Sequence, residues 1–365
     1  MTSRLMHSPE QSSLPASGQA EVPFASTFGV TAPVPAGPSA RPLKLVIQIP
    51  CLNEETTLPQ TLADLPRAIP GIATIETLVI DDGSADRTSD VARALGVTRV
   101  VRFTARRGLA QAFARGLWEA LDMGADIVVN TDADNQYRGD DVARLVAPIL
   151  AGQADMVIGD RQVDQVAAFS PLKKALQKLG SWVVGKLANV HVPDTTSGFR
   201  AYARNAALRL KVVSDFTYTV ETVIQATHKN IVIASVPVRT NPVTRPSRLF
   251  HSTVHYIQRS IATMLRMYVV YRPLRFFLSL SAVFLVASAA LFLRFLAIYL
   301  SAGRGVQTGH VQSLIVAGVL AMVGVLLMAL GVISDLIATN RRVLEEILVS
   351  ARTLRLEEST RRKQP

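Results

Sequence analysis

Short apolar runs alternate with segments of helical periodicity between residues 43 and 160. The apolar runs are rich in β-branched residues and cover Leu43–Pro50, Thr77–Asp82, Arg99–Phe103, Asp126–Asp132 and Met156–Asp160. The helical patterns between them cover Thr57–Ala68, Asp86–Leu95, Leu109–Met123 and Asp140–Leu150. Strands that alternate with helices in this way are typical of an α/β domain with a mainly parallel sheet.

Two longer apolar stretches follow towards the end of the chain. Phe276–Leu293 and Val311–Ile333 contain no charged residue, and about 20 apolar residues suffice to cross the hydrocarbon of a bilayer. Uncharged stretches of this length favour transmembrane helices over buried core helices, and we predict spans at 274–300 and 311–333.

Arginines flank this pair of predicted spans, whereas the connector Ser301–His310 holds only Arg304. The flanking arginines are Arg259, Arg266, Arg272, Arg275, Arg341, Arg342, Arg352 and Arg355. Positive charge favours the cytoplasmic side. The sequence therefore predicts a multi-pass protein of the cell (inner) membrane, with the α/β domain and both termini in the cytoplasm.

The remaining segments differ in composition. Residues 1–42 are rich in proline, serine and alanine, and they lack the continuous apolar region of a signal peptide, which predicts a disordered extension. The α/β domain is expected at 43–240, a juxtamembrane segment at 241–273, and a cytoplasmic C-terminal helix or tail at 334–365. The single cysteine, Cys51, excludes a disulfide framework and is expected to be a small buried residue.

The formal net charge of +11 is explained by the membrane-proximal region. The juxtamembrane segment carries apolar residues at helical spacing, with Arg259 and Arg266 on other faces, and this pattern predicts an interfacial amphipathic helix. Its apolar positions are Val254, Ile257, Ile261, Met264, Leu265 and Tyr268. The basic surplus thus suits an anionic membrane surface and does not require a nucleic-acid partner.

Polar and acidic residues gather where the predicted strands end. These residues are Asn53, Glu54, Asp81, Asp82, Asp132 and Asp134, and ligands of open α/β sheets bind at the carboxyl ends of the strands. No G-x-G-x-x-G or G-x-x-x-x-G-K-[ST] motif is present, which disfavours a dinucleotide-binding protein or a P-loop NTPase. Carboxylates at this edge instead indicate a metal-dependent site.

The stretch TDADNQ supplies the oxygen ligands for such a metal. Asp132 and Asp134 flank Ala133, and Gln136 follows. Two carboxylates and an amide oxygen suit Mg²⁺ or Mn²⁺ that shares its remaining positions with phosphate oxygens. An EF-hand is excluded by the residues at the sixth and twelfth loop positions, and Asp140 and Asp141 are expected to cap the next helix.

Four motifs in order, IPCLNEE (49–55), DDGSADRT (81–88), TDADNQ (131–136) and TTSGFRAYAR (195–204), resemble glycosyltransferase family 2. Within that family the chain is similar to the inverting polyprenyl-phosphate glycosyltransferases, such as dolichol-phosphate mannose synthases, over residues 43 to about 335. The resemblance implies a GT-A, Rossmann-like nucleotide-sugar-binding domain followed by two transmembrane helices.

The same resemblance assigns roles to residues. It implies a nucleotide-sugar pocket made by Pro50, Leu52, Glu54, Asp81, Asp82, Arg107, Asp132 and Ala133, with Asp82 on the base and Arg106 and Arg107 near the diphosphate. The family often has an aromatic residue where this chain has Leu52. Asp134 and Gln136 are the implied metal ligands, and Asp132 faces the ribose and diphosphate.

The acceptor side is assigned by resemblance as well. Arg161, Ser197 and Arg200 are implied to bind the acceptor phosphate, and Arg245 and Arg248 stand where the family has a basic segment near the active site. Asp194 could orient Arg200, act on the acceptor, or belong to a buried Asp–Arg pair. A lipid phosphate is already ionised near neutral pH and needs no general base, whereas arginine forks suit its orientation.

Three functions are compatible with these residues to different degrees. The favoured one is transfer of a hexose from a nucleotide-sugar, with UDP favoured over GDP, to a polyprenyl phosphate. The alternatives are a glycosyltransferase with another lipid acceptor, such as diacylglycerol, and a catalytically silent nucleotide-sugar-binding membrane partner; a homo-oligomer is compatible with each. A processive polysaccharide synthase is excluded because no Q-x-x-R-W motif follows TTSGFR.

Overall fold

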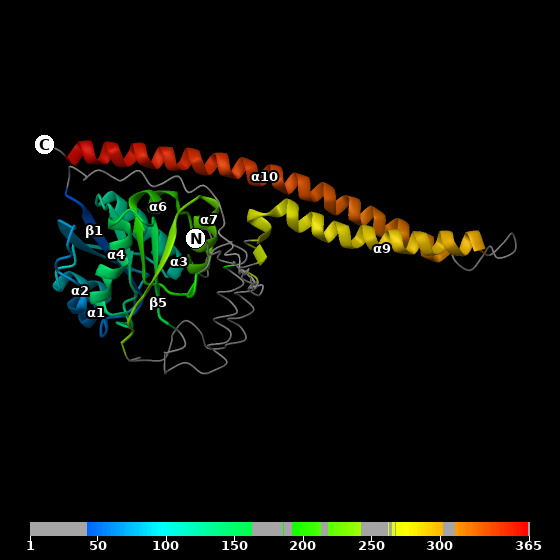
Figure 1. The fold of residues 1–365 in the computed structure, drawn as a ribbon. Helices are drawn as coiled ribbons and strands as arrows, with labels where there is room; N and C mark the ends of the chain where they lie inside the picture. The colour runs from blue at the N-terminus through cyan, green and yellow to red at the C-terminus, as the bar shows by residue number, and fades with distance from the viewer. Residues whose placement is uncertain are drawn as a thin grey trace, which may run out of the picture. The chain divides into compact units, whose positions relative to one another are not determined.

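The computed structural model describes residues 42–162, 185, 192–212, 218–241, 262, 265–266, 268–301 and 311–363 (Figure 1). The expected N-terminal extension, except for its last residue, lies outside these residues. So do most of the juxtamembrane segment and both of its predicted acceptor-binding residues, Arg245 and Arg248.

A seven-stranded mixed sheet forms the centre of the α/β domain, with strand order β3-β2-β1-β4-β6-β5-β7. Its strands are β1 (Lys44–Cys51), β2 (Thr74–Asp81), β3 (Arg99–Arg102), β4 (Ile127–Asn130), β5 (Met156–Asp160), β6 (Arg200–Ala203) and β7 (Ile233–Pro237). Strands β1 to β4 pair in parallel, as do β5 and β7, whereas β6 runs antiparallel to both of its neighbours, β4 and β5. The expected GT-A-type sheet is confirmed.

Helices cover both faces of this sheet, because its strands bury apolar residues on both sides. They are α1 (Leu58–Asp64), α2 (Thr88–Ala94), α3 (Leu109–Asp122), the 3₁₀ turn η1 (Gly139–Asp141), α4 (Val142–Leu150), α6 (Arg204–Arg209) and α7 (Tyr218–His228). One core joins α3, α6 and α7 to side chains such as Val46 and Leu78, and the other joins α1, α2 and α4 to the alternate positions Leu45 and Val79. The period-two alternation of the strands therefore builds two cores.

The sequence predicted β1 to β5 and α1 to α4 to within a few residues, except that α1 ends at Asp64 and not at Ala68. It did not predict β6, although β6 begins at Arg200, inside the motif TTSGFR. This strand has four residues and borders β4 and β5 in the middle of the sheet. Nothing local distinguishes so short a segment from a loop, and only its two neighbours make it a strand.

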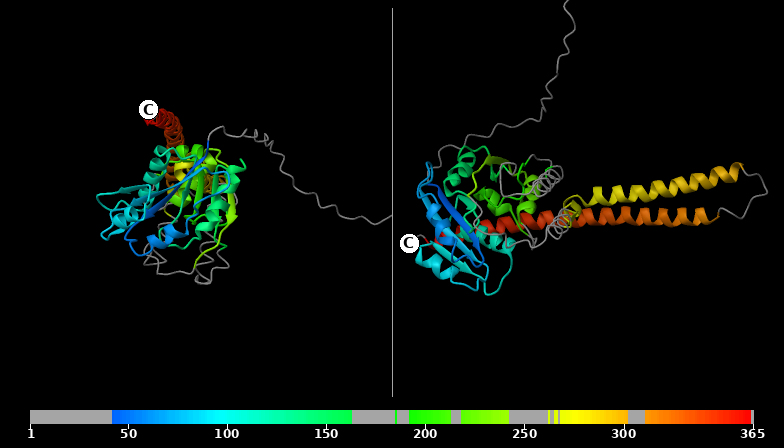
Figure 2. Two further views of the ribbon diagram at one scale, coloured as in Figure 1. Left: turned by 90° about the vertical axis from the view of Figure 1, so that its left-hand side faces the viewer. Right: turned by 90° about the horizontal axis from the view of Figure 1, so that it is seen from below.

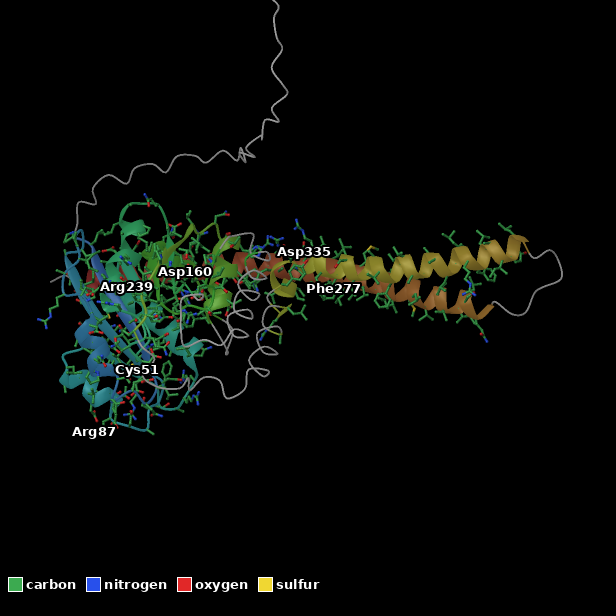
Figure 3. All side chains as sticks on the ribbon, turned by 60° about the horizontal axis from the view of Figure 1, so that its bottom comes forward. Cys51, Arg87, Asp160, Arg239, Phe277 and Asp335 are labelled. Atoms are coloured by element: carbon green, nitrogen blue, oxygen red, sulfur yellow. The ribbon has the colours of Figure 1, made fainter. Side chains whose placement is uncertain are left out.

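The two long apolar stretches form α9 (Pro273–Ser301) and α10 (Val311–Lys363), which lie side by side (Figure 2). Both are long and apolar enough to span a membrane, and only 11% and 17% of their most apolar windows are buried. Phe277 and Asp335 lie on these neighbouring helices, whose side chains are mostly carbon (Figure 3). Exposed apolar surface of this kind suits a lipid environment.

Small residues allow the two helices to approach closely. Along α10 the buried positions Ala317, Gly324, Gly331 and Ala338 recur every seven residues, the spacing that keeps one side of a helix on its partner. On α9, Ser281 Oγ donates to Gly324 O and Ser288 Oγ donates to Ala317 O, each at 2.7 Å. These bonds also satisfy hydroxyl groups that lipid could not solvate.

Helix α10 continues past the predicted span at 311–333 without a break. Its 53 residues reach about 80 Å at 1.5 Å per residue, against about 30 Å of hydrocarbon. Its C-terminal part contacts the α/β domain, where Glu345 pairs with Lys229 at 3.0 Å and the Arg352 guanidinium lies 5.4 Å from the centre of the Trp118 ring. The segment expected at 334–365 is therefore not a separate helix. As far as Lys363 it continues the helix that contains the second candidate span.

The close helix contact predicts the effect of a bulky residue at Gly324. A Cβ at this position would lie 2.7 Å from the Leu285 side chain, so we expect Gly324→Val to destabilise the protein by about 1–3 kcal/mol through overpacking. The measurement is thermal unfolding of the full-length protein in detergent. Gly318→Val is the matched control, because a Cβ there meets nothing within 4 Å; equal loss in both variants would contradict the packing argument.

Candidate active site

The carboxyl ends of β1, β2 and β4 meet at one edge of the sheet. In the parallel register Cys51 pairs with Asp81 across β1 and β2, and Gln48 pairs with Asn130 across β1 and β4. The loops that carry the predicted acidic residues therefore leave neighbouring strands side by side, as the sequence predicted. Cys51 is buried, also as predicted.

The loops after β1 and β2 hold one another through hydrogen bonds from backbone N–H groups of each loop to side-chain oxygens of the other. Asn53 N donates to Ser84 Oγ at 2.9 Å, and Asn53 Oδ1 accepts from Ala85 N at 2.8 Å. Glu54 N donates to Thr88 Oγ1 at 2.8 Å. Asn53 adopts a left-handed conformation with φ of 57°, which asparagine tolerates better than most residues. Both loops of the predicted nucleotide pocket are thus preorganised by the protein itself.

Asp81 and Asp82 have mainly structural contacts. Asp81 is fully buried and accepts hydrogen bonds from Ser84 N at 2.8 Å and from Ser89 Oγ. Asp82 accepts from Arg107 N and Gly108 N at 2.7 and 2.9 Å, at the start of α3. The role of Asp82 in binding the base stays a prediction, and it would use the lone pairs that these amides leave.

The remaining residues of the predicted pocket lie around this edge. Pro50 is buried within β1, Leu52 is half-buried, and Glu54 is buried and accepts from Thr57 Oγ1 at 2.6 Å. The Arg107 side chain is exposed and lies over the Phe103 ring, with 5.0 Å from its guanidinium carbon to the ring centre.

The loop after β4 carries Asp132, Asp134 and Gln136. Ala133 O accepts from Thr61 Oγ1 of α1 at 3.0 Å, and Gln136 N donates to Asp134 Oδ1 at 3.2 Å. Burial, together with the neighbouring Asp134, raises the pKa of Asp132 to about 7, although Arg161 and Arg200 oppose the shift. The negative charges of Asp132 and Asp134 therefore repel one another. A bound cation would offset this repulsion.

The donor set of this loop fits a hard divalent cation that is shared with a ligand. Within the described parts of the chain, no group of three or more His, Cys, Asp or Glu side chains could hold a metal ion alone. Asn135 Oδ1 is buried, and no described residue hydrogen-bonds to it. Asp134 and Gln136 supply carboxylate and amide oxygens, so phosphate oxygens would have to complete the coordination.

Arg161 and Asp194 form a buried ion pair. Arg161 Nε and Nη2 donate to the two Asp194 oxygens at 2.6 and 3.0 Å, and Nη2 also donates to Thr196 Oγ1 at 2.8 Å. Of the alternatives for Asp194, the structure therefore shows the Asp–Arg pair, with Arg161 and not Arg200 as the partner. Nη1 of Arg161 is left without a hydrogen-bond partner among the described residues, and its two N–H groups could bind a phosphate.

Arg200 has a different environment, because it is fully buried. Its guanidinium donates to Ser197 O at 2.7 Å and Thr195 O at 2.6 Å, and to Thr219 O and Thr222 Oγ1 at 2.8 Å. Ser197 is fully buried too. Direct contact of either residue with an acceptor phosphate stays a prediction that would require this loop to open; as observed, Arg200 fixes the loop's shape.

A buried polar network that the sequence analysis missed links β1 and β4 to this loop. Asn130 Oδ1 accepts from Gln48 Nε2 at 2.8 Å, and Asn130 Nδ2 donates to Gly198 O and Tyr218 OH at 2.8 and 3.0 Å. A Cβ on Gly198 would lie 3.0 Å from both Asp132 carboxylate oxygens. The available signal was an uncharged amide side chain within each strand pattern, Gln48 in LKLVIQIP and Asn130 in DIVVNTD.

Asp141 also differs from its prediction. It precedes α4, but its side chain makes no capping hydrogen bond and instead accepts from Arg239 N and Nη2, both at 2.7 Å. The prediction that Asp141 caps the helix was wrong, because a buried carboxylate gains more from a guanidinium than from exposed amides. Asp140 is exposed and pairs with Arg138 at 3.1 Å.

Known proteins resemble this chain over the same region. The family model described as Glycosyl transferase family 2 matches residues 46–210. An uncharacterized protein of Methanocaldococcus jannaschii is 32% identical over 204 residues, which are 54% of this chain and 81% of that protein. The dolichyl-phosphate hexose transferase of Haloferax volcanii is 30% identical over 198 residues, 53% of this chain and 81% of that enzyme. The chain belongs to glycosyltransferase family 2 and is a glycosyltransferase.

Two more proteins are similar to this chain over a shorter stretch or at lower identity. The undecaprenyl-phosphate mannosyltransferase of Micrococcus luteus is 31% identical over 166 residues, 44% of this chain and 66% of that enzyme. The glucosyl-3-phosphoglycerate synthase of Mycobacterium tuberculosis, solved with Mn²⁺, UDP and phosphoglyceric acid, aligns at 22% identity with a TM-score of 0.49, over 62% of this chain and 78% of that chain. At this level of similarity, those ligands describe that enzyme and not this chain.

The buried ion pair predicts a pH-dependent stability. Burial alone would raise the pKa of Asp194, but Arg161 and the hydrogen bonds from Thr196 outweigh it and hold the pKa below its ordinary value. The charge of Asp194 therefore stabilises the fold above the unfolded pKa of about 3.9, and this contribution is lost as the pH falls through the lower folded pKa.

We expect Asp194→Asn to lower the free energy of unfolding at neutral pH, by up to about 3–5 kcal/mol, because Arg161 loses its counter-charge. The gap between wild type and variant should shrink as the pH falls below about 4. The measurement is chemical unfolding of the full-length protein in detergent at several pH values. A gap independent of pH would show that the charge of Asp194 is not what stabilises the loop.

Proposed function

We propose that this glycosyltransferase transfers a hexose from a nucleotide-sugar, with UDP favoured, to a polyprenyl phosphate at the cytoplasmic face of the cell membrane. The observation that carries the proposal is the contact between the two predicted halves of the site: a Cβ on Gly198, in the motif TTSGFR, would lie 3.0 Å from both carboxylate oxygens of Asp132. This closeness supports a single site in which carboxylates hold a metal and Arg161, whose Nη1 has no hydrogen-bond partner among the described residues, binds the acceptor phosphate. Relatives named for dolichyl-phosphate and undecaprenyl-phosphate acceptors support the choice of acceptor.

On the donor side, the loops after β1, β2 and β4 bind the nucleotide-sugar, and Asp134 and Gln136 hold Mg²⁺ or Mn²⁺. When bound, the cation neutralises charge on the leaving diphosphate, which favours the transition state over the ground state. Asp132 lies against Gly198 and would face the ribose and diphosphate.

On the acceptor side, a phosphate oxygen of the lipid attacks the anomeric carbon and the bond from this carbon to the diphosphate oxygen breaks. The electron pair of the broken bond leaves with the nucleoside diphosphate, and the anomeric configuration is inverted. The ionised phosphate has no proton to lose, so no general base is required. Arg161 orients it through Nη1, while Asp194 fixes the guanidinium plane.

The membrane hairpin explains how the site reaches a lipid substrate. Helices α9 and α10 would anchor the chain, and arginines at both outer ends favour a cytoplasmic α/β domain. The acceptor phosphate lies in the headgroup layer, so anchoring turns its encounter with the site into an effectively intramolecular event. A different lipid acceptor, such as diacylglycerol, would present a hydroxyl and would need a base.

We expect Asp134→Asn to reduce transfer of radiolabelled sugar to extracted polyprenyl phosphate by about 10²–10³-fold, the scale for losing one preorganised electrostatic contact in the transition state. The full-length protein in detergent is the material, with Mg²⁺ or Mn²⁺ present. The matched control is Asp90→Asn, which alters an exposed carboxylate of α2 that pairs with Arg93. Undiminished transfer by Asp134→Asn would sink the metal assignment.

The acceptor role of Arg161 is tested by Arg161→Lys. Lysine can still pair with Asp194, but it has no second nitrogen to offer a phosphate. We expect the KM for polyprenyl phosphate to rise about 10- to 100-fold, since a hydrogen bond to a charged group contributes about 1.5–3 kcal/mol. The affinity for the donor nucleotide, measured by the thermal shift with UDP, should stay at the wild-type level. Weakened UDP binding with an unchanged KM for polyprenyl phosphate would contradict the assignment.

A further inference from the structure

The segment that follows β7 lies along the predicted metal loop. Tyr137 and Thr240 form an antiparallel bridge, and Arg138 N donates to Arg239 O at 3.4 Å. Asn241 then makes two hydrogen bonds, from its backbone N to Gln136 O at 2.8 Å and from Nδ2 to Asn135 O at 2.9 Å. Residues 239–241 thus act as a short extra strand against residues 135–138.

An ion pair between the exposed Arg239 side chain and the buried Asp141 fixes the register of this contact. Asp141 is fully buried, and it accepts from Arg239 N and Nη2 at 2.7 Å and from Nε at 3.1 Å. A bidentate pair with an added backbone bond leaves the segment little freedom to slide. Arg239 and Asp141 therefore bring Asn241 to the same carbonyl groups each time the domain folds.

The two carbonyl groups bound by Asn241 belong to the residues directly after Asp134. Asn135 has a φ of 55° in the left-handed region, which is unfavourable for most residues and persists only when neighbours hold it. Gln136 N is held from the other side by Asp134 Oδ1. Asn241 therefore restrains the two peptide groups that flank Gln136, and the N–H of one of them donates to Asp134 Oδ1.

We propose that Asn241 is a positioning residue for the divalent cation, an inference that rests on the metal-dependent function proposed above. Through the carbonyls of Asn135 and Gln136 it presets the loop before the metal and the diphosphate arrive. The buried Asn135 Oδ1, to which no described residue hydrogen-bonds, is consistent with a loop that is completed by a ligand.

The test measures Mn²⁺ binding to the full-length protein in detergent with UDP present. The electron paramagnetic resonance signal of free Mn²⁺ reports how much of the ion remains unbound. We expect Asn241→Ala to raise the Kd for Mn²⁺ about 10- to 100-fold, the scale for residues that orient metal ligands. Asn241→Asp keeps the size of the side chain but cannot donate to Asn135 O, so it should weaken binding at least as much.

Asn230→Ala is the control for general destabilisation. Asn230 also has a left-handed φ, of 51°, but it follows α7, and its backbone N donates to Thr227 O of that helix at 3.4 Å. We expect this variant to lose thermal stability and to keep the wild-type Kd for Mn²⁺.

An unchanged Kd in Asn241→Ala, beside clear binding by wild type, would overturn the positioning role and leave the proposed function intact. If wild type fails to bind Mn²⁺ with UDP, the metal assignment and this inference both fall.

Discussion

Opposite charges meet around the carboxylate of Asp132: burial raises its pKa, Asp134 and Glu54 raise it further, and Arg161 and Arg200 lower it. In a site partly shielded from water, these carboxylates need guanidinium groups that stay in place. A guanidinium that moved away would leave a carboxylate without a counter-charge. Asp194 fixes Arg161, and backbone carbonyls fix Arg200. The geometry of the site therefore depends on the loop from Asp194 to Arg200 and on the strand that follows it.

Backbone hydrogen bonds give the same site its rigidity on the donor side. The loops after β1 and β2 are joined through Asn53 and Ser84, and the loop after β4 is joined to the segment after β7 through Asn241. Main-chain groups and short polar side chains make these contacts, so the loops keep their shape before a ligand arrives. A preorganised site of this kind loses little free energy to reorganisation when charge develops.

The hairpin of α9 and α10, the two candidate membrane spans, follows a different physical rule from the α/β domain. In lipid, apolar surface would supply no driving force between the helices, and small residues and hydroxyl-to-carbonyl bonds, such as Ser281 to Gly324, hold them together. The α/β domain instead uses two aliphatic cores and a mixed sheet. Helix α10 belongs to both, since Leu356, near its end, is buried in a core that α3 also forms.

The sequence by itself determined the parallel half of the sheet, the acidic residues at its edge and both apolar helices, because each of these follows from a local period or from the end of an apolar run. Only the tertiary structure decided that Arg161 pairs with Asp194, that Arg239 pairs with Asp141, and that Arg200 begins a buried antiparallel strand. Those partners are far apart along the chain. Their choice depends on which strands become neighbours, and no local pattern of apolar and polar residues encodes that.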